Sequence, residues 1–515
     1  MSLALSLLWS LELLTLRQAP AGTPLHIRLT SAVGSFASRP GEPLRAVLIA
    51  PVAVRDETLL PQGSTLSGKV KSVQRVGLGV VRETATLDLE FNQVTLPNGQ
   101  SVPISARVAR VDNGREHVNQ EGSIRGVRTT GSVCYRASGY IRTVLAWHVE
   151  ARLATWAIKT LIVQVPEPEI FYPPGVELTL ALTEPLLSIP PAEPPQTTRR
   201  LSGEERAEVT RLVQAIPYRT YSPSSNRPSD LINLLFIGSR DQLAAAFTAA
   251  GWTETDSPTL RSRIKGIQAV AESRGYRAAP MSALLLSEAE PDTSWQKGFN
   301  SVAKRHHIRV WKQSDTWRGQ ELWAGAATHD IDFAYLRPGQ PLTHRIEENV
   351  DLERDKIAHD LIFTSCVDVA DWLERSGVPG VARNATGDLM MTDTRVAVIQ
   401  LNDCEAPRTT AQYAEAARLP ARGNVLQRFV RREILSVRSD LIRTNPYWRS
   451  YEGARWLFTA IRRHKRLPSG PDASSYKITT SDSPSPSRLA SAAITRLHEG
   501  LSRLRSTQSP ESANR

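Results

Sequence analysis

The chain has 515 residues, 41% hydrophobic and 22% charged, which is ordinary for a globular protein and predicts two or three domains. Cys134, Cys366 and Cys404 are widely spaced and odd in number, so we expect no zinc pattern, no disulfide framework and at least one buried free thiol. Residues 424–515 carry ten of the eleven net positive charges, so the folded part is nearly neutral. Such a basic end favours anionic lipid or nucleic acid as a partner, and a solvated tail without a partner is an equal alternative.

The first residues resemble a secretory signal. Residues 2–16 are leucine-rich, and Ala19 and Ala21 supply the small residues that a signal peptidase recognises. We therefore expect residues 1–21 to be a signal peptide and the protein to be exported. Glu12 and the lack of a preceding Lys or Arg leave an N-terminal core helix as the alternative. No later run reaches about 18 uninterrupted apolar residues, so we expect no spanning helix.

Residues 22–188 are predicted to form a β-rich domain. Short alternating runs indicate strands at residues 25–31, 44–54, 65–76, 80–95 and 101–112. Asn98-Gly99 predicts a hairpin turn between the last two strands. A helix is expected at 140–161, where core packing is favoured over a membrane-surface role.

One phrase occurs twice in this domain, as LLPQGSTLSGKV at 59–70 and as FYPPGVELTLAL at 171–182. The repeat suggests two equivalent strand entries in one small β-barrel or sandwich. Proline-glycine-led strands of this kind resemble the β-rich envelope domain of type IV secretion channel components related to the conjugative protein TrbI.

A proline-rich linker at 189–200 marks the expected boundary to an α+β domain at 201–423. Ser202 is expected to start a helix. A continuous apolar strand at 230–237 leads through Gly238-Ser239 into a helix at 242–250, and another helix is expected around 259–274. A capped turn at Ser239 is favoured over an anion site at the helix N-terminus.

The stretch from 305 to 360 contains five of the ten histidines and many carboxylates. Residues 305–313 and 321–328 alternate as two strands of a hairpin linked by 314–320, with Val310 opposite Trp323. His329 and Asp330 then lie at the same end as His306 and His307. Because successive strand residues face opposite sides, His306 and His307 cannot enter one pocket.

A helix is expected from about 349 to 363, with Val350, Ile357 and Leu361 on its buried face. Glu348, Asp351, Asp355 and His359 form a band beside that face. Stacked carboxylates require a cation, a proton or a metal among them. Arg354 and Lys356 are the alternative source of that charge.

Several motifs in order resemble the LssY C-terminal domain of bacteria over roughly residues 215–400. They are NLLFIGSRDQLAAAFTAAGWTETD at 233–256, RHHIRVW, LWAGAATHDID, LTHRIEENVDLERDKIAHDL and a following segment with Trp372. The resemblance implies an envelope and lipid-phosphate context, because related proteins join this domain to DedA-like and phosphatidic-acid-phosphatase-like membrane domains. No phosphatase motif is present, and Asp332 replaces the glycine of the family's THDIG. The residues carried over by motif are His306, His307, His329, Asp330, His344, Glu353, Arg354 and Asp355.

Residues 424–463 predict basic amphipathic helices, with packing on the domain favoured over an interfacial membrane role, and residues 464–515 predict a disordered basic tail. The fold class is therefore α+β, with an N-terminal small β-barrel or sandwich, a C-terminal α+β domain and that tail. We expect an exported, envelope-associated LssY-like protein that binds anionic lipid or glycan phosphate groups, or envelope proteins, and no nucleic acid.

The arginines expected to bind the anion are Arg305, Arg309 and Arg354. The alternative function is a hydrolase of a lipid- or glycan-linked phosphate that uses acid–base chemistry or a divalent metal. Its catalytic candidates are His329, Asp330, His344 and Asp355. Its candidate metal ligands are His306, His307, His329, Asp351, Asp355 and His359.

Overall fold

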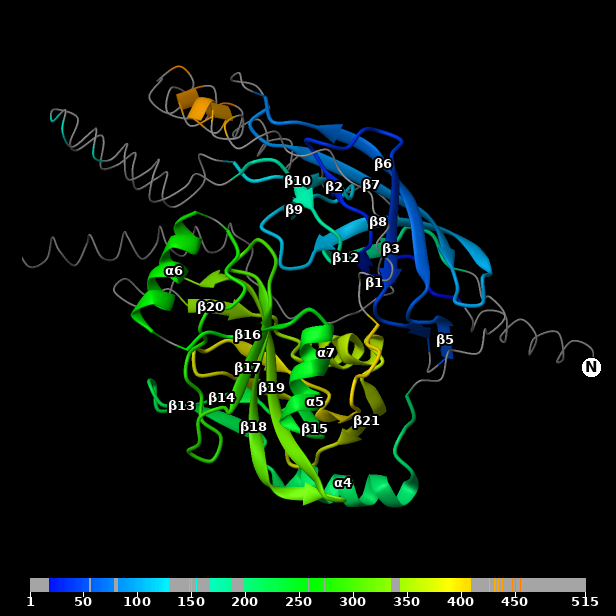
Figure 1. The fold of residues 1–515 in the computed structure, drawn as a ribbon, viewed down its shortest axis with the longest axis vertical. Coiled ribbons are helices and arrows are strands. Elements are labelled where there is room, and N and C mark those ends of the chain that lie inside the picture. Colours follow the sequence, from blue (N-terminus) through cyan, green and yellow to red (C-terminus); the bar gives the residue numbers. More distant parts are fainter. Residues whose placement is uncertain are drawn as a thin grey trace, which may run out of the picture. The chain divides into compact units, whose positions relative to one another are not determined.

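The computed structural model describes residues 18–54, 57–77, 82–128, 167–186, 198–257, 259–272, 274–334 and 343–408, with single residues between 148 and 154 and between 426 and 454 (Figure 1). The chain divides into two compact units, residues 1–444 and residues 445–515. Every helix and strand with defined bounds belongs to the first unit. The predicted features at residues 1–17, 140–161, 189–197 and 464–515 lie outside, or almost wholly outside, the described residues.

The first domain is a closed antiparallel barrel of six strands. Their order is β6-β3-β1-β12-β8-β7, and a β6–β7 pairing closes the ring, which leaves no unpaired edge. The strands are β1 (Pro24–Leu29), β3 (Pro43–Leu48), β6 (Thr65–Gln74), β7 (Thr86–Thr95), β8 (Ser101–Val111) and β12 (Glu177–Leu182). The minor strands are β2 (Val33–Gly34), β4 (Val52–Val54), β5 (Glu57–Leu60), β9 (His117–Val118), β10 (Ile124–Arg125) and β11 (Phe171–Tyr172).

The repeated phrase makes two equivalent turns, as predicted. Gly63 and Gly175 both have positive φ, 86° and 96°, which glycine adopts without strain. The Gly63 N–H donates to Leu48 O at the end of β3, and the Gly175 N–H donates to Leu29 O at the end of β1. Each turn then delivers a strand, β6 or β12, into the same barrel.

The start of the barrel bears on the predicted signal peptide. Ala19 is buried in the barrel core and exchanges two backbone hydrogen bonds with Leu186. Cleavage after Ala21 would remove this pairing. Among the described residues, no helix combines the length and apolar composition needed to cross a membrane.

The second domain is built on a mixed sheet in the order β16-β17-β18-β19-β15-β24-β21, with β20 paired to β19. Only the β15–β24 pair is parallel among these described strands. The strands are β15 (Leu234–Ile237), β16 (Thr253–Glu254), β17 (Thr293–Lys297), β18 (Arg305–Trp317), β19 (Gln320–Ala334), β20 (Thr343–Ile346), β21 (Val367–Glu374) and β24 (Arg395–Leu401). Two small hairpins flank the sheet, β13 (Arg219–Ser222) with β14 (Arg227–Leu231), and β22 (Val381–Arg383) with β23 (Leu389–Met391).

Helices cover both faces of this sheet. Helices α5 (Arg240–Ala249) and α7 (Asp351–Phe363) share one core with it, whereas α4 (Gly203–Ala215) packs in the other. Helix α6 spans Leu260–Ala271. Ser202 caps α4 and Ser239 caps α5, each in a capping box, so the predicted capped turn at Ser239 is confirmed.

Several expectations need correction. The chain is richer in strands than the α+β prediction implies, although the barrel is confirmed. The strand predicted at 230–237 is divided into β14 and β15, because the Asn233 side chain hydrogen-bonds the backbone of Ala327 in β19. Cys366 and Cys404 form a disulfide, so the expectation of no disulfide was wrong, and Cys134 lies outside the described residues.

Candidate metal centre

The long strands β18 and β19 form a hairpin that sets the position of the histidines (Figure 1). His306 pairs with His329 and Val310 with Gly325, so the predicted register was wrong by two residues. Two features cause the difference: a tight turn at Arg318-Gly319, both with positive φ, replaces the longer predicted link, and the register shifts again between Lys312 and Thr316. A shift of two residues preserves the face of each side chain, so His306 and His307 still point to opposite sides.

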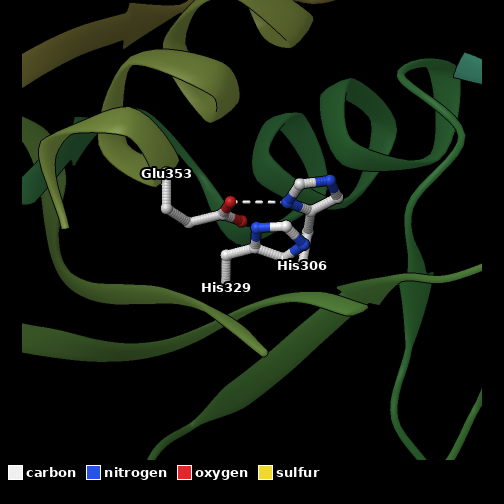
Figure 2. Close-up of side chains that lie close together, drawn as sticks. All are labelled: His306, His329 and Glu353. Carbon is white, nitrogen blue, oxygen red and sulfur yellow. Dashed lines mark hydrogen bonds and ion pairs between the residues drawn. The ribbon is translucent and has the colours of Figure 1, made fainter. Parts of the chain in front are cut away.

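His306, His329 and Glu353 meet on the α7 side of the sheet and form what we call the His–His–Glu cluster (Figure 2). His306 Nδ1 lies 2.5 Å from Glu353 Oε2, and the two imidazole rings stack with centroids 4.1 Å apart. One candidate ligand atom from each residue lies within 4.8 Å of the others. Donors of a tetrahedral zinc ion lie about 3.3 Å apart, so these three atoms would have to approach one another by at most about 1.5 Å to bind one ion.

The cluster retains unused polar atoms although it is buried. His306, His329 and Glu353 are at most 7% exposed. His306 Nε2, His329 Nε2 and Glu353 Oε1 have no hydrogen-bond partner among the described residues. Buried polar atoms are almost always paired, so three such atoms in one cluster mark a place where a water, an ion or a ligand would complete the pairing. Two imidazoles and one carboxylate are a donor set that suits zinc.

Burial sets the protonation of the cluster. It lowers the pKa of His306 well below its ordinary range and the pKa of His329 to about 4, so both imidazoles are neutral at pH 7. A neutral imidazole is the form that binds a metal. Burial also raises the pKa of Glu353 well above its ordinary value. A nearby divalent cation would favour its carboxylate form.

Glu353 was carried over by the motif resemblance but was not among the predicted metal ligands. It lies at helical spacing from Val350 and Ile357, on the buried face of α7, and a carboxylate on that face was the signal available. The predicted ligands Asp351 and Asp355 instead contact Arg354, at 3.1 and 2.8 Å. The negative charge of these two carboxylates is therefore compensated by Arg354, which was the predicted alternative to a metal.

A second cluster occupies the opposite face of the hairpin, around Asp330. Arg305 Nε donates to Asp330 at 3.0 Å, and the Nδ1 atoms of His307 and His344 lie 3.7 and 3.4 Å from the same carboxylate oxygen. Thr328 Oγ1 is 2.8 Å from His307 Nε2. The structure thus brings Asp330 and His344 together with His307, and separates all three from His329.

The three arginines predicted to bind an anion are buried in contacts with carboxylates. Arg305 pairs with Asp330, and Arg309 lies 3.4 Å from Asp230 and donates to Ser282 O. Arg354, which is 1% exposed, also contacts Asp393 at 2.6 Å. The physical reason is that a buried guanidinium requires carboxylate partners, which leaves these groups poorly placed for a ligand.

A cavity of about 300 Å³ reaches the His–His–Glu cluster. The barrel contributes Thr23, Pro24, His26, Arg110 and the segment 49–53 to its lining. The second domain contributes the cluster together with Glu347, Leu352, Asp355, Lys356, His359 and Asp360, so the predicted catalytic residue Asp355 opens on this cavity although Arg354 pairs with it. His359 therefore opens on the same cavity, although it is outside the cluster of candidate ligands. Three protein ligands facing a cavity leave a coordination position for water or substrate, as in catalytic zinc sites.

A family model described as LssY C-terminus matches residues 214–396, which confirms the resemblance drawn from the motifs. The search of curated proteins found no match. Among solved structures, the chain is similar to ComB10 of the Com type IV secretion system of Helicobacter pylori, with 10% identity and a TM-score of 0.20, over 35% of this chain and 94% of that one. Residues 214–396, which contain the whole His–His–Glu cluster, are thus an LssY-like C-terminal domain.

Proposed function

We propose that the LssY-like domain is a hydrolase that uses one divalent metal ion, most simply zinc, held by His306, His329 and Glu353. The observation that carries this proposal is the coincidence of buried, unpaired donor atoms in all three residues. The set of two histidines and one glutamate is one that catalytic zinc sites use, with the fourth position left to water or substrate.

A metal in this position lowers the pKa of a bound water and polarises the ester or phosphoryl oxygen of a substrate. The chain's own residues would hold and orient this metal ion. The stacking of His306 on His329 and the contact of His306 with Glu353 limit the rotation of both rings. His306, His329 and Glu353 are themselves buried, and electrostatic interactions are stronger in such surroundings than in water.

We further propose that the protein works in the cell envelope. The leucine-rich start supports export. The disulfide between Cys366 and Cys404 adds support, because disulfides persist in oxidising compartments and are rare in the cytosol. The LssY family context implies the same location.

The test uses the full chain, purified without chelators, and measures bound metal together with hydrolysis of a panel of phosphate and carboxylate esters. Wild type is expected to hold about one zinc per chain, whereas His306→Ala, His329→Ala and Glu353→Gln lose most of it and lose hydrolysis. The matched controls are His117→Ala, an exposed histidine on β9, and Glu348→Gln, an exposed glutamate just before α7. Both should retain metal and activity.

Two results would contradict the proposal. In the first, wild type and the three cluster variants hold equal amounts of metal, which places the metal elsewhere. In the second, zinc-loaded wild type hydrolyses no member of the panel faster than Glu353→Gln does. This result would reject the proposed hydrolase activity and leave only a metal-binding site.

A further inference from the structure

The cavity beside the His–His–Glu cluster is built by both domains. Its floor comes from β18, β19 and α7, and its opposite wall comes from the barrel. That wall contains His26 on β1, Arg110 on β8 and residues 49–53, which follow β3. A ligand that reaches the cluster therefore contacts the barrel as well.

A buried group of five charges holds the barrel against the site, and we call it the interdomain charge cluster. Glu177 of β12 contacts Arg28, Lys297 and Lys356, each at 2.7 Å. Asp360 contacts the same three cations at 3.2, 2.8 and 2.9 Å. Lys356 and Asp360 belong to α7, the helix that carries Glu353, so these contacts fix the barrel wall relative to the metal ligands.

The barrel wall of the cavity and part of its rim are apolar. The lining also includes the carboxylates of Glu347, Asp355 and Asp360, of which Asp355 pairs with Arg354 and Asp360 pairs with the cations of the interdomain charge cluster. The barrel contributes Ile49, Pro51 and Val52, and α7 contributes Leu352. Leu352 is 54% exposed although it adjoins Glu353 and lines the cavity. An apolar surface that leads to a few polar groups is the usual composition of a small-molecule site and favours a ligand with an apolar part.

Arg110 is the cation of this cavity that is best placed for a ligand. Lys356 also lines it, but Glu177 and Asp360 neutralise that ammonium group. The Arg110 side chain is 43% exposed, and its ion pair with Asp112 involves Nε at 3.0 Å. A guanidinium has four further N–H donors in a fork that matches phosphate oxygens. Its charge also contributes to the lowered pKa values of His306 and His329.

We infer that the cavity takes an amphiphilic anionic ester of the alkyl phosphate class. Its phosphate lies between the His–His–Glu cluster and Arg110, and its chain lies along residues 49–53 and Leu352. This inference rests on the proposed metal site and names the substrate class of that site. A cavity of about 300 Å³ is at the small end of ligand pockets, so it accommodates a headgroup and a short chain segment.

The test measures binding to the zinc-loaded full chain by calorimetry, with hexyl phosphate, inorganic phosphate and hexyl glucoside as probes. Hexyl phosphate should bind at least about tenfold more tightly than either of the others, because only it uses both the charged end and the apolar wall. Arg110→Ala should weaken hexyl phosphate binding about tenfold or more, and Arg110→Lys should restore part of it. Arg107→Ala, an exposed arginine on the same strand, is the matched control and should bind as wild type does.

Zinc content, measured in the same samples, separates the two proposals. If the samples hold no zinc at His306, His329 and Glu353, the proposed function fails. If zinc is bound but inorganic phosphate binds as well as hexyl phosphate, or Arg110→Ala has no effect, only the substrate class is overturned. Leu352→Asn adds a second test, because this exposed position tolerates the change and should selectively weaken hexyl phosphate. Binding to phosphatidic acid vesicles as well as hexyl phosphate would assign a lipid headgroup, and binding to hexyl phosphate alone would assign a soluble ester.

Discussion

The substitution Asp360→Asn tests whether the interdomain charge cluster is as finely balanced as its composition implies. The cluster contains three cations and two carboxylates, so its net charge is +1, and the substitution raises this to +2. Asp360 also accepts a hydrogen bond from Trp252 Nε1 at 3.0 Å. Removing one partner of a buried ion pair costs about 3–5 kcal/mol, which is the loss in free energy of unfolding that we expect.

Lys297→Met should behave differently, because it leaves two cations facing two carboxylates. Burial and the neighbouring Arg28 lower the pKa of Lys297 to about 8, so its ammonium group is already unfavourable there. We therefore expect a cost of only about 1 kcal/mol from its loss. Urea unfolding of the full chain at pH 7, followed by tryptophan fluorescence, measures both variants. Asp368→Asn, at an exposed position on β21, is the control and should change stability by less than about 0.5 kcal/mol.

Equal stability of Asp360→Asn and Asp368→Asn would show that the cluster does not hold the domains together. A loss in free energy of unfolding for Lys297→Met as large as that for Asp360→Asn would refute the claim that the excess positive charge decides the stability of the cluster, even if the cluster is stabilising.

Three further predictions concern stability. Burial lowers the pKa of His359 to about 4, with Asp355, His26, Asp360 and Lys356 facing it. The unfolded chain therefore binds more protons than the folded chain between about pH 6.5 and 4, so stability falls as pH falls through that window. His329 and His306 add to this loss, so the share of His359 is measured by difference: in urea titrations, His359→Gln should lose less stability than wild type over the same window, by on the order of 3 kcal/mol. Replacing Cys366 and Cys404 with serine opens a link across 38 residues and should cost about 4 kcal/mol in the chain-entropy account, measured as a lower unfolding midpoint; no change would argue against the disulfide. Ser239→Ala should cost about 1 kcal/mol through loss of the α5 cap, and a neutral result would contradict the capping geometry.

Local patterns predicted the features that depend on neighbouring residues. Alternation in residues 305–313 placed His306 on the face of Ile308 and Val310, which the structure buries in one core. The Pro-x-Gly phrase predicted two equivalent turns because the left-handed backbone at Gly63 and Gly175 is a local requirement. Ser202 and Ser239 predicted helix starts for the same reason, because a capping box depends only on residues that lie within four positions of one another.

Features that depend on long-range packing were not predictable in this way. The Cys366–Cys404 pair forms because β21 and β24 are antiparallel neighbours. Cys366 precedes β21 and Cys404 follows β24, so both lie at the same end of the strand pair. The role of the barrel in the cavity requires β1, β8 and the 49–53 segment to meet α7, and no spacing in the sequence encodes that contact. The contacts of the segment near residue 435 are also long-range and could not be predicted from local patterns. Leu435 packs in the barrel core and Arg431 pairs with Glu169, which favours packing on the protein over a membrane role.

The most direct test of the metal centre is a crystal of the full chain grown with zinc, with diffraction data collected on both sides of the zinc absorption edge. The account predicts one strong anomalous peak about 2.0–2.2 Å from an imidazole nitrogen of His306, an imidazole nitrogen of His329 and a carboxylate oxygen of Glu353. It also predicts that this peak is absent from Glu353→Gln crystals treated identically. A peak at other residues, or none at this cluster in wild type, would contradict the central claim.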